Sequence, residues 1–409
     1  MKFSSKFAAA TENYSTIKNH LPNPLMRRSF MLPVLPAKSE ITVCGEGCYE
    51  IFVNGQNITK GYMAPYRSNP DHYLYYDNYD VSSYLKQGEN VVALILGNGF
   101  INPDQTTWNF KDVTWRSAPK AALCFEADGK ILFEADSFKC SESAITFEEF
   151  HAGEHYDARL EQPGWNDSGF DDSAWRNVLP AATPKGEPRI PDCEPIGIIG
   201  VHYPARIIKT SHGTFIYDFA VNCAGLCELN IKGERGQKVT LLYGETIKNG
   251  KVDVTNISFG SNTEKGYIQQ DEYILKGGEN EKYMPHFTYH GFRYVEVSGI
   301  TAAQAKLSLL TFMEMSSAFE ETGDFFCDNA DVNAVTECTK RSDRANFMYF
   351  PTDCPQREKN GWTGDAALSC DQFLLLYDCS RSLKEWLRNI FKAQNEQGAI
   401  PGIIPTCDW

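Results

Sequence analysis

A short segment near the carboxyl end of the chain holds its densest group of residue types that could do chemistry. Residues 352–365 read TDCPQREKNGWTGD and combine carboxylates, basic side chains and a tryptophan. Pro355, Gly361 and Gly364 disfavour a continuous helix, so we expect a loop. Carboxylates bind hydroxyls and move protons while an aromatic face packs on a pyranose, so the combination suits sugar chemistry. The alternative is a solvated charged loop without a function.

Charge and hydropathy restrict the class of protein. The 409 residues include 39 basic and 53 acidic side chains, a net charge of −14, which excludes the usual kind of nucleic-acid binder. No apolar stretch approaches the roughly 20 residues that cross a bilayer. The amino-terminal residues MKFSSKFAAATENYSTIKNHLPNP lack the apolar run of a secretory signal. We therefore expect a cytoplasmic protein with neither nucleic-acid nor membrane partners.

The cysteines and histidines do not form an evident metal motif. The 13 cysteines are irregularly spaced, and the pairs Cys44 with Cys48 and Cys223 with Cys227 lack histidines at zinc-ligand spacing. Residues 151–155, HAGEH, fit an inverted zinc-peptidase pattern, but a glycine interrupts the helix that would align both histidines. We expect free thiols, ordered loop histidines, no bound metal and no cofactor.

Two β-rich blocks precede the charged segment. In residues 38–191, short apolar runs such as ITVCG, YEIFVNG and VVALILGNG predict an antiparallel β-sandwich followed by a loop-rich bridge. Within it, Asn54 and Gly55 predict a two-residue hairpin turn. Residues 192–315, with TFIYDFA, CELNIKG and KVTLLYGE, predict a second sandwich. Residues 1–37 are assigned to an amino-terminal extension.

Residues 316–409 change to helical spacing. A first helix is expected from Asp328, its candidate cap, to Phe350, and a second from near Gly364. The third should open with a capping box at residues 382–385, SLKE, and close at Gly398. The last residues, GAIPGIIPTCDW, read as an apolar loop, so we expect only part of a larger helical domain.

The charged segment resembles the signature loop of bacterial α-L-rhamnosidases, in which DCPQR is followed by an acidic residue, by GW and by GD. The similarity extends over nearly the whole chain. YEIFVNGQNITKGYMAPY and YDARLEQPGWNDSGFDDSAW resemble the family's amino-terminal carbohydrate-binding-like domain, and FIYDFAVNCAGLCELNIKGERGQKVTLLYGE resembles its next β-domain. The resemblance implies two antiparallel β-sandwich domains followed by the first helices of a truncated (α/α)6 barrel.

The resemblance also implies an activity, the hydrolysis with inversion of terminal α-L-rhamnosyl linkages in a rhamnose-containing glycoside or oligosaccharide. Carried over by position, Glu358 would be the general acid that protonates the leaving oxygen. Asp353 and Asp365 would bind rhamnose hydroxyls, and Arg357 and Trp362 would line the pocket. Neighbouring carboxylates and desolvation by Trp362 would favour the protonated carboxyl that an acid requires.

Inversion also needs a second carboxylate, roughly 6.5–9.5 Å from the acid, as the base. The resemblance places that base beyond residue 409, so we expect the isolated chain to have little or no hydrolase activity. The alternative is a non-catalytic carbohydrate-binding protein that uses its sandwiches. A sugar platform could come from aromatic residues of the first sandwich, unless alternate members are core: Tyr73, Tyr75, Tyr76, Tyr79 and Trp108. The aglycone and the oligomeric state stay open.

Overall fold

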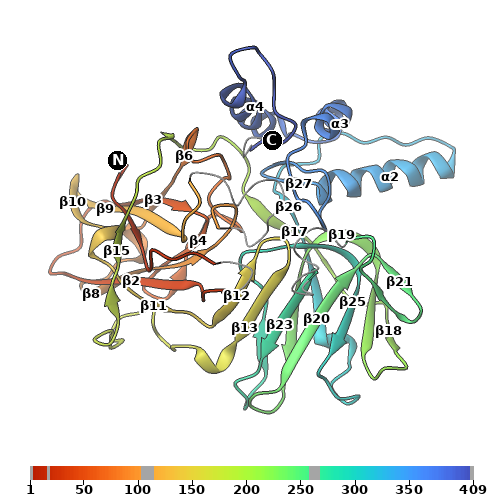
Figure 1. The fold of residues 1–409 in the computed structure, drawn as a ribbon, viewed down its shortest axis with the longest axis horizontal. Helices are drawn as coiled ribbons and strands as arrows, with labels where there is room; N and C mark the ends of the chain where they lie inside the picture. Colours follow the sequence, from red (N-terminus) through yellow and green to blue (C-terminus); the bar gives the residue numbers. More distant parts are fainter. Residues whose placement is uncertain (1–2, 16–18, 103–114, 258–267, 406–409) are drawn as a thin grey trace. The chain divides into compact units, whose positions relative to one another are not determined.

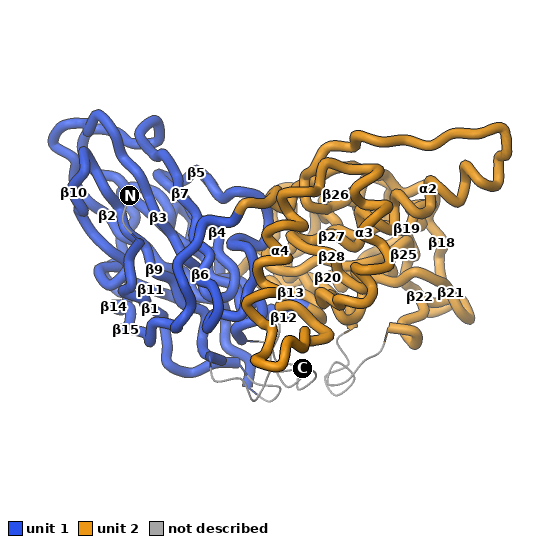
Figure 2. The backbone as a smooth tube through the Cα atoms, turned by 90° about the horizontal axis from the view of Figure 1, so that it is seen from above, with its two compact units in different colours: residues 1–150, 160–191 blue, residues 151–159, 192–409 orange. Residues whose placement is uncertain are grey.

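The computed structural model of the chain describes residues 3–15, 19–102, 115–257 and 268–405 (Figure 1). The chain divides into two compact units, each with an apolar core of its own. The first unit comprises residues 1–150 and 160–191, and the second comprises residues 151–159 and 192–409 (Figure 2). Within the described ranges, no helix has the length and apolar character needed to cross a membrane.

The first unit is a sandwich of two antiparallel sheets. One sheet has the order β15 (Leu179–Ala181), β1 (Phe7–Ala9), β9 (Lys120–Ala127), β3 (Ser39–Glu46) and β7 (Asp77–Asp80), with β10 (Lys130–Glu134) on β9. The other has the order β14 (Arg176–Asn177), β11 (Lys139–Glu142), β2 (Pro24–Leu32), β8 (Gly88–Gly97), β4 (Cys48–Val53) and β5 (Gln56–Asn57). The remaining strands are β12 (Ile145–Glu149) and the parallel pair β6 (Tyr73–Tyr75) and β16 (Glu187–Arg189).

This architecture confirms the expected antiparallel sandwich, because side chains from both sheets, such as Val43 of β3 and Leu94 of β8, share one buried core. The predicted hairpin is also present: Asn54 and Gly55 have φ of 49° and 81° and connect β4 to β5. The amino-terminal stretch is more than an extension. Its residues include the whole of β1 and β2, and both strands are paired within the sandwich.

The second unit is built on one long sheet. Its order is β13 (Gly153–Asp157), β23 (Gln270–Ile274), β20 (Lys238–Gly244), β25 (His290–Ser298), β19 (Phe215–Ile231), β26 (Leu310–Ser317) and β17 (Ile196–His202). β18 (Arg206–Lys209) and β24 (Glu281–Tyr283) pair with β19, and β21 (Thr246–Lys248) pairs with β22 (Lys251–Asp253). β19 is 17 residues long and changes partners along its length. Residues 151–159, expected in the first domain, belong here because β13 pairs with β23.

Three helices follow the sheet in the second unit: α2 (Ala330–Ala345), α3 (Thr363–Leu376) and α4 (Ser380–Ala393) (Figure 1). The prediction that the first helix reaches Phe350 is wrong. It ends at Ala345, and residues 347–351 form the small pair β27 (Phe347–Met348) and β28 (Phe350–Pro351) around Tyr349, whose φ is 71°. Its cap is Asn329 rather than Asp328, because the Asn329 side chain accepts hydrogen bonds from the first turn.

The predicted capping box at residues 382–385 is wrong, because its side chains bind another segment of the chain. Helix α4 begins at Ser380 and ends at Ala393, so Ser382 lies inside its first turn and Gly398 lies beyond its end. The Ser382 Oγ accepts the Glu194 N–H at 3.2 Å, and the Glu385 Oε2 accepts the Asp192 N–H at 3.1 Å. The two side chains therefore hold the start of the second unit's main segment instead of capping their own helix.

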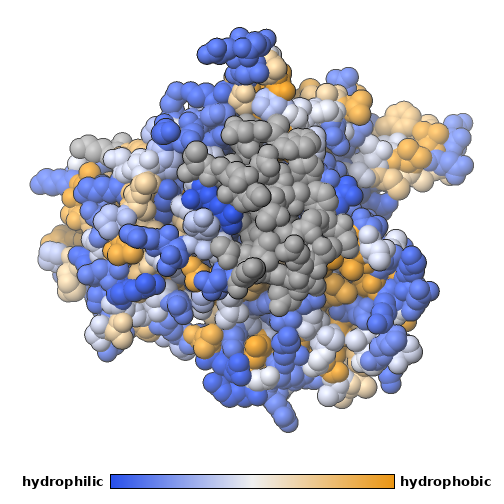
Figure 3. Space-filling model, viewed as in Figure 1, coloured by the Kyte–Doolittle hydropathy of each residue, from blue (hydrophilic) through white to orange (hydrophobic). Residues whose placement is uncertain are grey.

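The helices differ in how their apolar residues are used. Helix α4 buries Leu383, Trp386 and Ile390. By contrast, Val335 of α2 is 65% exposed and Leu368 of α3 is 89% exposed. Figure 3 shows apolar side chains gathered over the outer end of α2. These exposed faces can accept a further apolar partner.

Candidate active-site loop

The segment at 352–362 is a loop between β28 and α3, as predicted. The stretch before the carboxyl end packs against its exit: the Ile404 N–H donates to the Gly361 carbonyl at 2.9 Å, and the Thr363 N–H donates to the Gly402 carbonyl at 2.9 Å. A Cβ at position 361 would lie 1.9 Å from the Ile404 oxygen, so only glycine permits this approach. The stretch near the carboxyl end, which we expected to be an apolar loop, is therefore partly buried against the exit of the charged loop.

The middle of the loop rests on the second β-domain. A Cβ on Gly291 of β25 would lie 2.5 Å from the Pro355 ring, so the missing side chain makes room for the loop. The Gln356 Nε2 donates to the Glu245 Oε2 at 3.1 Å. Lys359 is fully buried, and its Nζ donates to the Tyr289 carbonyl oxygen at 2.5 Å. The same Nζ lies 4.6 Å from the centre of the Tyr289 ring. These contacts fix the backbone on both sides of Glu358.

His151 provides another contact to the loop, which sequence reasoning missed. Its Nε2 donates to the Glu358 carbonyl oxygen at 2.9 Å, across 207 residues of sequence. The other members of the HAGEH pattern have different partners. Glu154 accepts from Tyr283 and His286, and His155 lies 3.7 Å from Glu272. His151 of this pattern therefore supports the loop, and only its proximity to the loop in space reveals this.

Asp353 is held inside the loop by two donors. Its Oδ1 accepts the Asn360 N–H at 3.0 Å, and its Oδ2 accepts the Cys354 thiol at 2.8 Å. Burial raises the pKa of Asp353 to about 6, and the charge of Glu358 acts in the same direction. Burial together with the Asp353 charge raises the pKa of the Cys354 thiol to about 11. Cys354 is accordingly a hydrogen-bonding and packing residue, since a nucleophile would need the thiolate.

Glu358 has a donor on each carboxyl oxygen. The Trp362 Nε1 donates to its Oε2 at 2.7 Å, and the Arg357 Nη2 lies 3.2 Å from its Oε1. The structure thus brings Glu358, Arg357 and Trp362 together, with the Glu358 side chain 12% exposed. Asp365 stands outside this hydrogen-bonded group of described residues. It is exposed in the first turn of α3, where its charge complements the helix dipole.

The arrangement can carry proton-transfer chemistry. It presents one carboxyl, Asp353, with a pKa raised to about 6, and a second, Glu358, whose orientation is set by an indole and a guanidinium. Both lie on a loop anchored to a sheet, so the reacting groups are held in fixed positions.

The first unit offers a different kind of candidate. A cavity of about 200 Å³ is lined by polar and small residues of that unit alone, including Asn23, Asn98 and Arg176. Of the aromatic residues considered for a sugar platform, Tyr75 and Tyr79 are buried, Tyr73 and Tyr76 are half-buried, and Trp108 lies outside the described residues. The described tyrosines are thus mainly structural.

Comparison with known proteins gives the same family as the motif of the loop. The chain matches three models of one family: the α-L-rhamnosidase N-terminal domain over residues 35–200, the bacterial α-L-rhamnosidase concanavalin-like domain over residues 208–315, and the 6 hairpin glycosidase domain of the same proteins over residues 320–409. The chain belongs to the bacterial α-L-rhamnosidase family. The expected fold, two β-domains followed by the first helices of the glycosidase domain, is confirmed.

Individual relatives show the same relationship. An α-L-rhamnosidase of Formosa agariphila is 30% identical over 371 residues, covering 86% of this chain and 38% of that protein. The structure of an Aspergillus terreus α-L-rhamnosidase superposes with a TM-score of 0.87 at 28% identity, covering 98% of this chain and 46% of that one. The structure of a Streptomyces avermitilis α-L-rhamnosidase complexed with L-rhamnose superposes with a TM-score of 0.85 at 27% identity, covering 94% of this chain and 37% of that one. The chain spans about two fifths of the length of the curated relatives it matches.

Asp353 makes stability depend on pH in a defined direction. Its pKa is about 6 when folded, against 3.8 for the unperturbed carboxyl, so folding favours the protonated form. The resulting stabilisation, on the order of 3 kcal/mol, is complete below about pH 4 and is lost as pH rises through about 6. Asp353→Asn should remove this dependence, measured as the difference between variant and parent in thermal unfolding across that range. The exposed Asp365→Asn is the control, and parallel pH profiles for parent and Asp353→Asn would contradict the assignment.

His151→Ala should loosen the loop without unfolding the unit. Removal of the Nε2 donor leaves the Glu358 carbonyl unpaired, so amide hydrogen exchange at residues 354–361 should accelerate about tenfold. Exchange in α4 should stay unchanged. The matched control is His212→Ala, an exposed histidine of the same unit. Equal exchange in the loop for both variants would show that His151 does not hold it.

Proposed function

We propose that this chain forms the part of an α-L-rhamnosidase that supplies the general acid, in a reaction that hydrolyses terminal α-L-rhamnosyl linkages with inversion. The substrate would be a rhamnose-containing glycoside or oligosaccharide. The observation that carries the proposal is the Glu358 carboxyl, oriented by Trp362 and Arg357 on a loop whose motif and fold belong to the rhamnosidase family. The rhamnose complex of the Streptomyces avermitilis relative supports the choice of sugar.

In this proposal each loop residue has a distinct task. Glu358 protonates the glycosidic oxygen as the bond to the anomeric carbon breaks. Trp362 and Arg357 orient that carboxyl and line the sugar pocket. Asp353 and Asp365 accept hydrogen bonds from rhamnose hydroxyls, Asp353 from within the loop and Asp365 from the first turn of α3.

The base would come from outside these 409 residues. Two observations support this: the chain spans about two fifths of its curated relatives, and apolar side chains of α2 and α3 are exposed where additional helices can pack. A base placed opposite Glu358 would activate a water on the far face of the sugar ring. Acid and base would then be held by different segments of one barrel.

Glu358→Gln tests the acid in a full-length rhamnosidase that contains this chain. The variant cannot donate a proton, so kcat toward an alkyl or flavonoid rhamnoside should fall by about 10²–10⁴. The kcat toward a 2,4-dinitrophenyl rhamnoside should fall much less, because its leaving group needs no protonation. L-rhamnose binding, measured by calorimetry, should persist. The exposed Glu396→Gln serves as control, and an equal loss on both substrates would remove Glu358 from the role of acid.

The isolated 409-residue chain should lack ordinary turnover. Without a base to activate water, hydrolysis of 4-nitrophenyl α-L-rhamnoside should lie at least about 10³-fold below a typical glycosidase kcat. Parallel calorimetry with L-rhamnose distinguishes a sugar-binding protein from an inert one. Turnover at several per second would place the base within this chain and contradict the proposal.

A further inference from the structure

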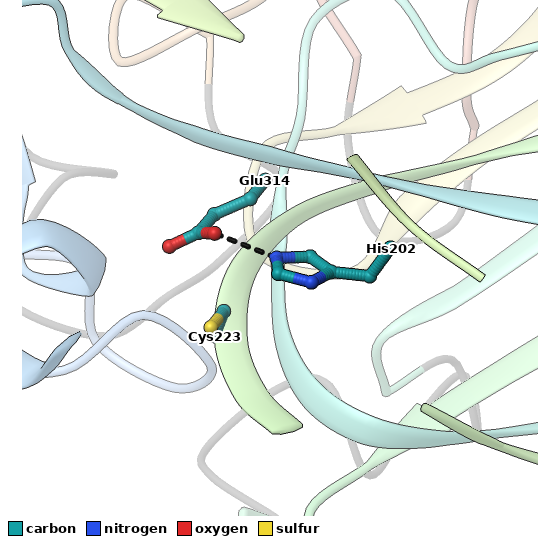
Figure 4. Close-up of side chains that lie close together, drawn as sticks. All are labelled: His202, Cys223 and Glu314. Atoms are coloured by element: carbon teal, nitrogen blue, oxygen red, sulfur yellow. Dashed lines mark hydrogen bonds and ion pairs between the residues drawn. The ribbon is translucent and has the colours of Figure 1, made fainter. Parts of the chain in front are cut away.

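A second group of reactive side chains lies in the sheet of the second unit, formed by His202 of β17, Cys223 of β19 and Glu314 of β26 (Figure 4). The His202 Nε2 and the Glu314 Oε2 are 2.7 Å apart. One nitrogen, one sulfur and one oxygen of the three residues all lie within 4.8 Å of one another. None of these residues belongs to the loop at 352–362.

The strand register brings the three side chains to one face. Glu314 is on the central strand of the three, opposite Gly200 of β17 on one side and Gly225 of β19 on the other. Because side chains alternate along a strand, His202 and Cys223, each two residues from one of these glycines, point to the same face as Glu314. They approach Glu314 diagonally from opposite sides.

The absence of a side chain at Gly200 keeps the space above Glu314 open. A Cβ there would lie 2.7 Å from the Glu314 Oε2 and 3.4 Å from the His202 Nε2. Pairing irregularities occur next to two of these positions, between Ile198 and Gly200 in β17 and between Asp218 and Cys223 in β19. Such bulges redirect side chains and are common next to functional sites.

We propose that His202, Cys223 and Glu314 form a zinc site. Imidazole nitrogen, thiolate sulfur and carboxylate oxygen are the ligands that Zn²⁺ prefers, at about 2.0–2.1, 2.3 and 2.0–2.2 Å. Ligand atoms within 4.8 Å of one another can reach these distances through small side-chain rotations. The His202 side chain is 30% exposed, whereas Cys223 and Glu314 are buried.

The charge of the three ligands matches that of a divalent cation. One thiolate and one carboxylate neutralise Zn²⁺. The thiolate is the form of cysteine that ligates a metal, so Zn²⁺ binding would release the Cys223 thiol proton. The Arg344 Nε lies 3.9 Å from the Glu314 Oε1 and therefore neighbours the oxygen that does not face His202.

This site departs from the metal-free expectation. The sequence places Cys223 beside Cys227, four positions away, without a histidine at ligand spacing. The structure instead combines Cys223 with residues of two other strands, one on each side of it in the chain. The metal would clamp β17, β26 and β19 to one another, a structural role that does not depend on the proposed hydrolase activity.

Metal binding by the full chain tests the site directly. After treatment with a chelator, the protein should take up one equivalent of Zn²⁺ in equilibrium dialysis. Substitution with Co²⁺ should produce the near-ultraviolet thiolate-to-metal band and the visible bands of a tetrahedral site. Cys223→Ser should abolish the thiolate band and weaken Zn²⁺ binding at least a hundredfold. His202→Gln and the isosteric Glu314→Gln should each weaken binding at least tenfold.

Matched controls separate this site from other thiols and histidines. Cys338→Ser and His212→Ala remove exposed residues of the same unit and should leave the stoichiometry and the band unchanged. Zn²⁺ should also raise the unfolding temperature of the parent chain but not that of Cys223→Ser. The proposal fails if the parent binds no Zn²⁺ or Co²⁺, or if the thiolate band survives in Cys223→Ser. Circular dichroism verifies folding, and if Cys223→Ser is misfolded, full-strength binding by Glu314→Gln and His202→Gln overturns the site.

Discussion

The signature loop concentrates charged groups in a place that is largely out of water, and a buried charge is tolerated only when it is paired or hydrogen-bonded. Lys359, with no exposed surface, shows the constraint most clearly. Its ammonium donates to the Tyr289 carbonyl and lies over the Tyr289 ring. The loop therefore depends on the second β-domain for its conformation. This domain provides the acceptors and the ring that hold the residues on both sides of Glu358.

The same dependence explains how distant segments converge on the loop. His151 precedes the second β-domain's main segment, Gly291 lies within it and Ile404 follows the last helix, yet all three contact residues 355–361. Each contact acts on the backbone or ring of the loop and leaves the carboxyls to their own donors. Position is thus fixed from outside the loop, whereas the orientation of Glu358 is fixed from inside it by Arg357 and Trp362. Such layered support is what holds a catalytic group to a productive geometry.

Glycines serve both sites in this unit in the same physical way. Gly291 and Gly361 let the loop approach a strand and a neighbouring segment, and Gly200 leaves room above Glu314. In each case a Cβ would meet another atom at 2.7 Å or less, so the absence of a side chain is itself the structural requirement. This requirement could not be derived from the chain's composition, because the neighbouring atoms come from residues far away in sequence.

Local chemistry determined what the sequence alone could predict. The turn at Asn54 and Gly55, the strand alternation and the non-helical loop around Pro355 follow from backbone preferences that act over a few residues, and the motif of the loop identified its family. Tertiary structure decided what depends on partners. Ser382 and Glu385 match a capping box, but they bind residues 192–194 because those N–H groups are nearby in space. His151 meets Glu358 through packing of the loop, and strand pairing brings His202 close to Cys223 and Glu314, in both cases across long stretches of chain. Sequence spacing reports neighbours along a helix or strand, whereas these contacts are set by register between strands and by packing of the loop, which only the folded chain defines.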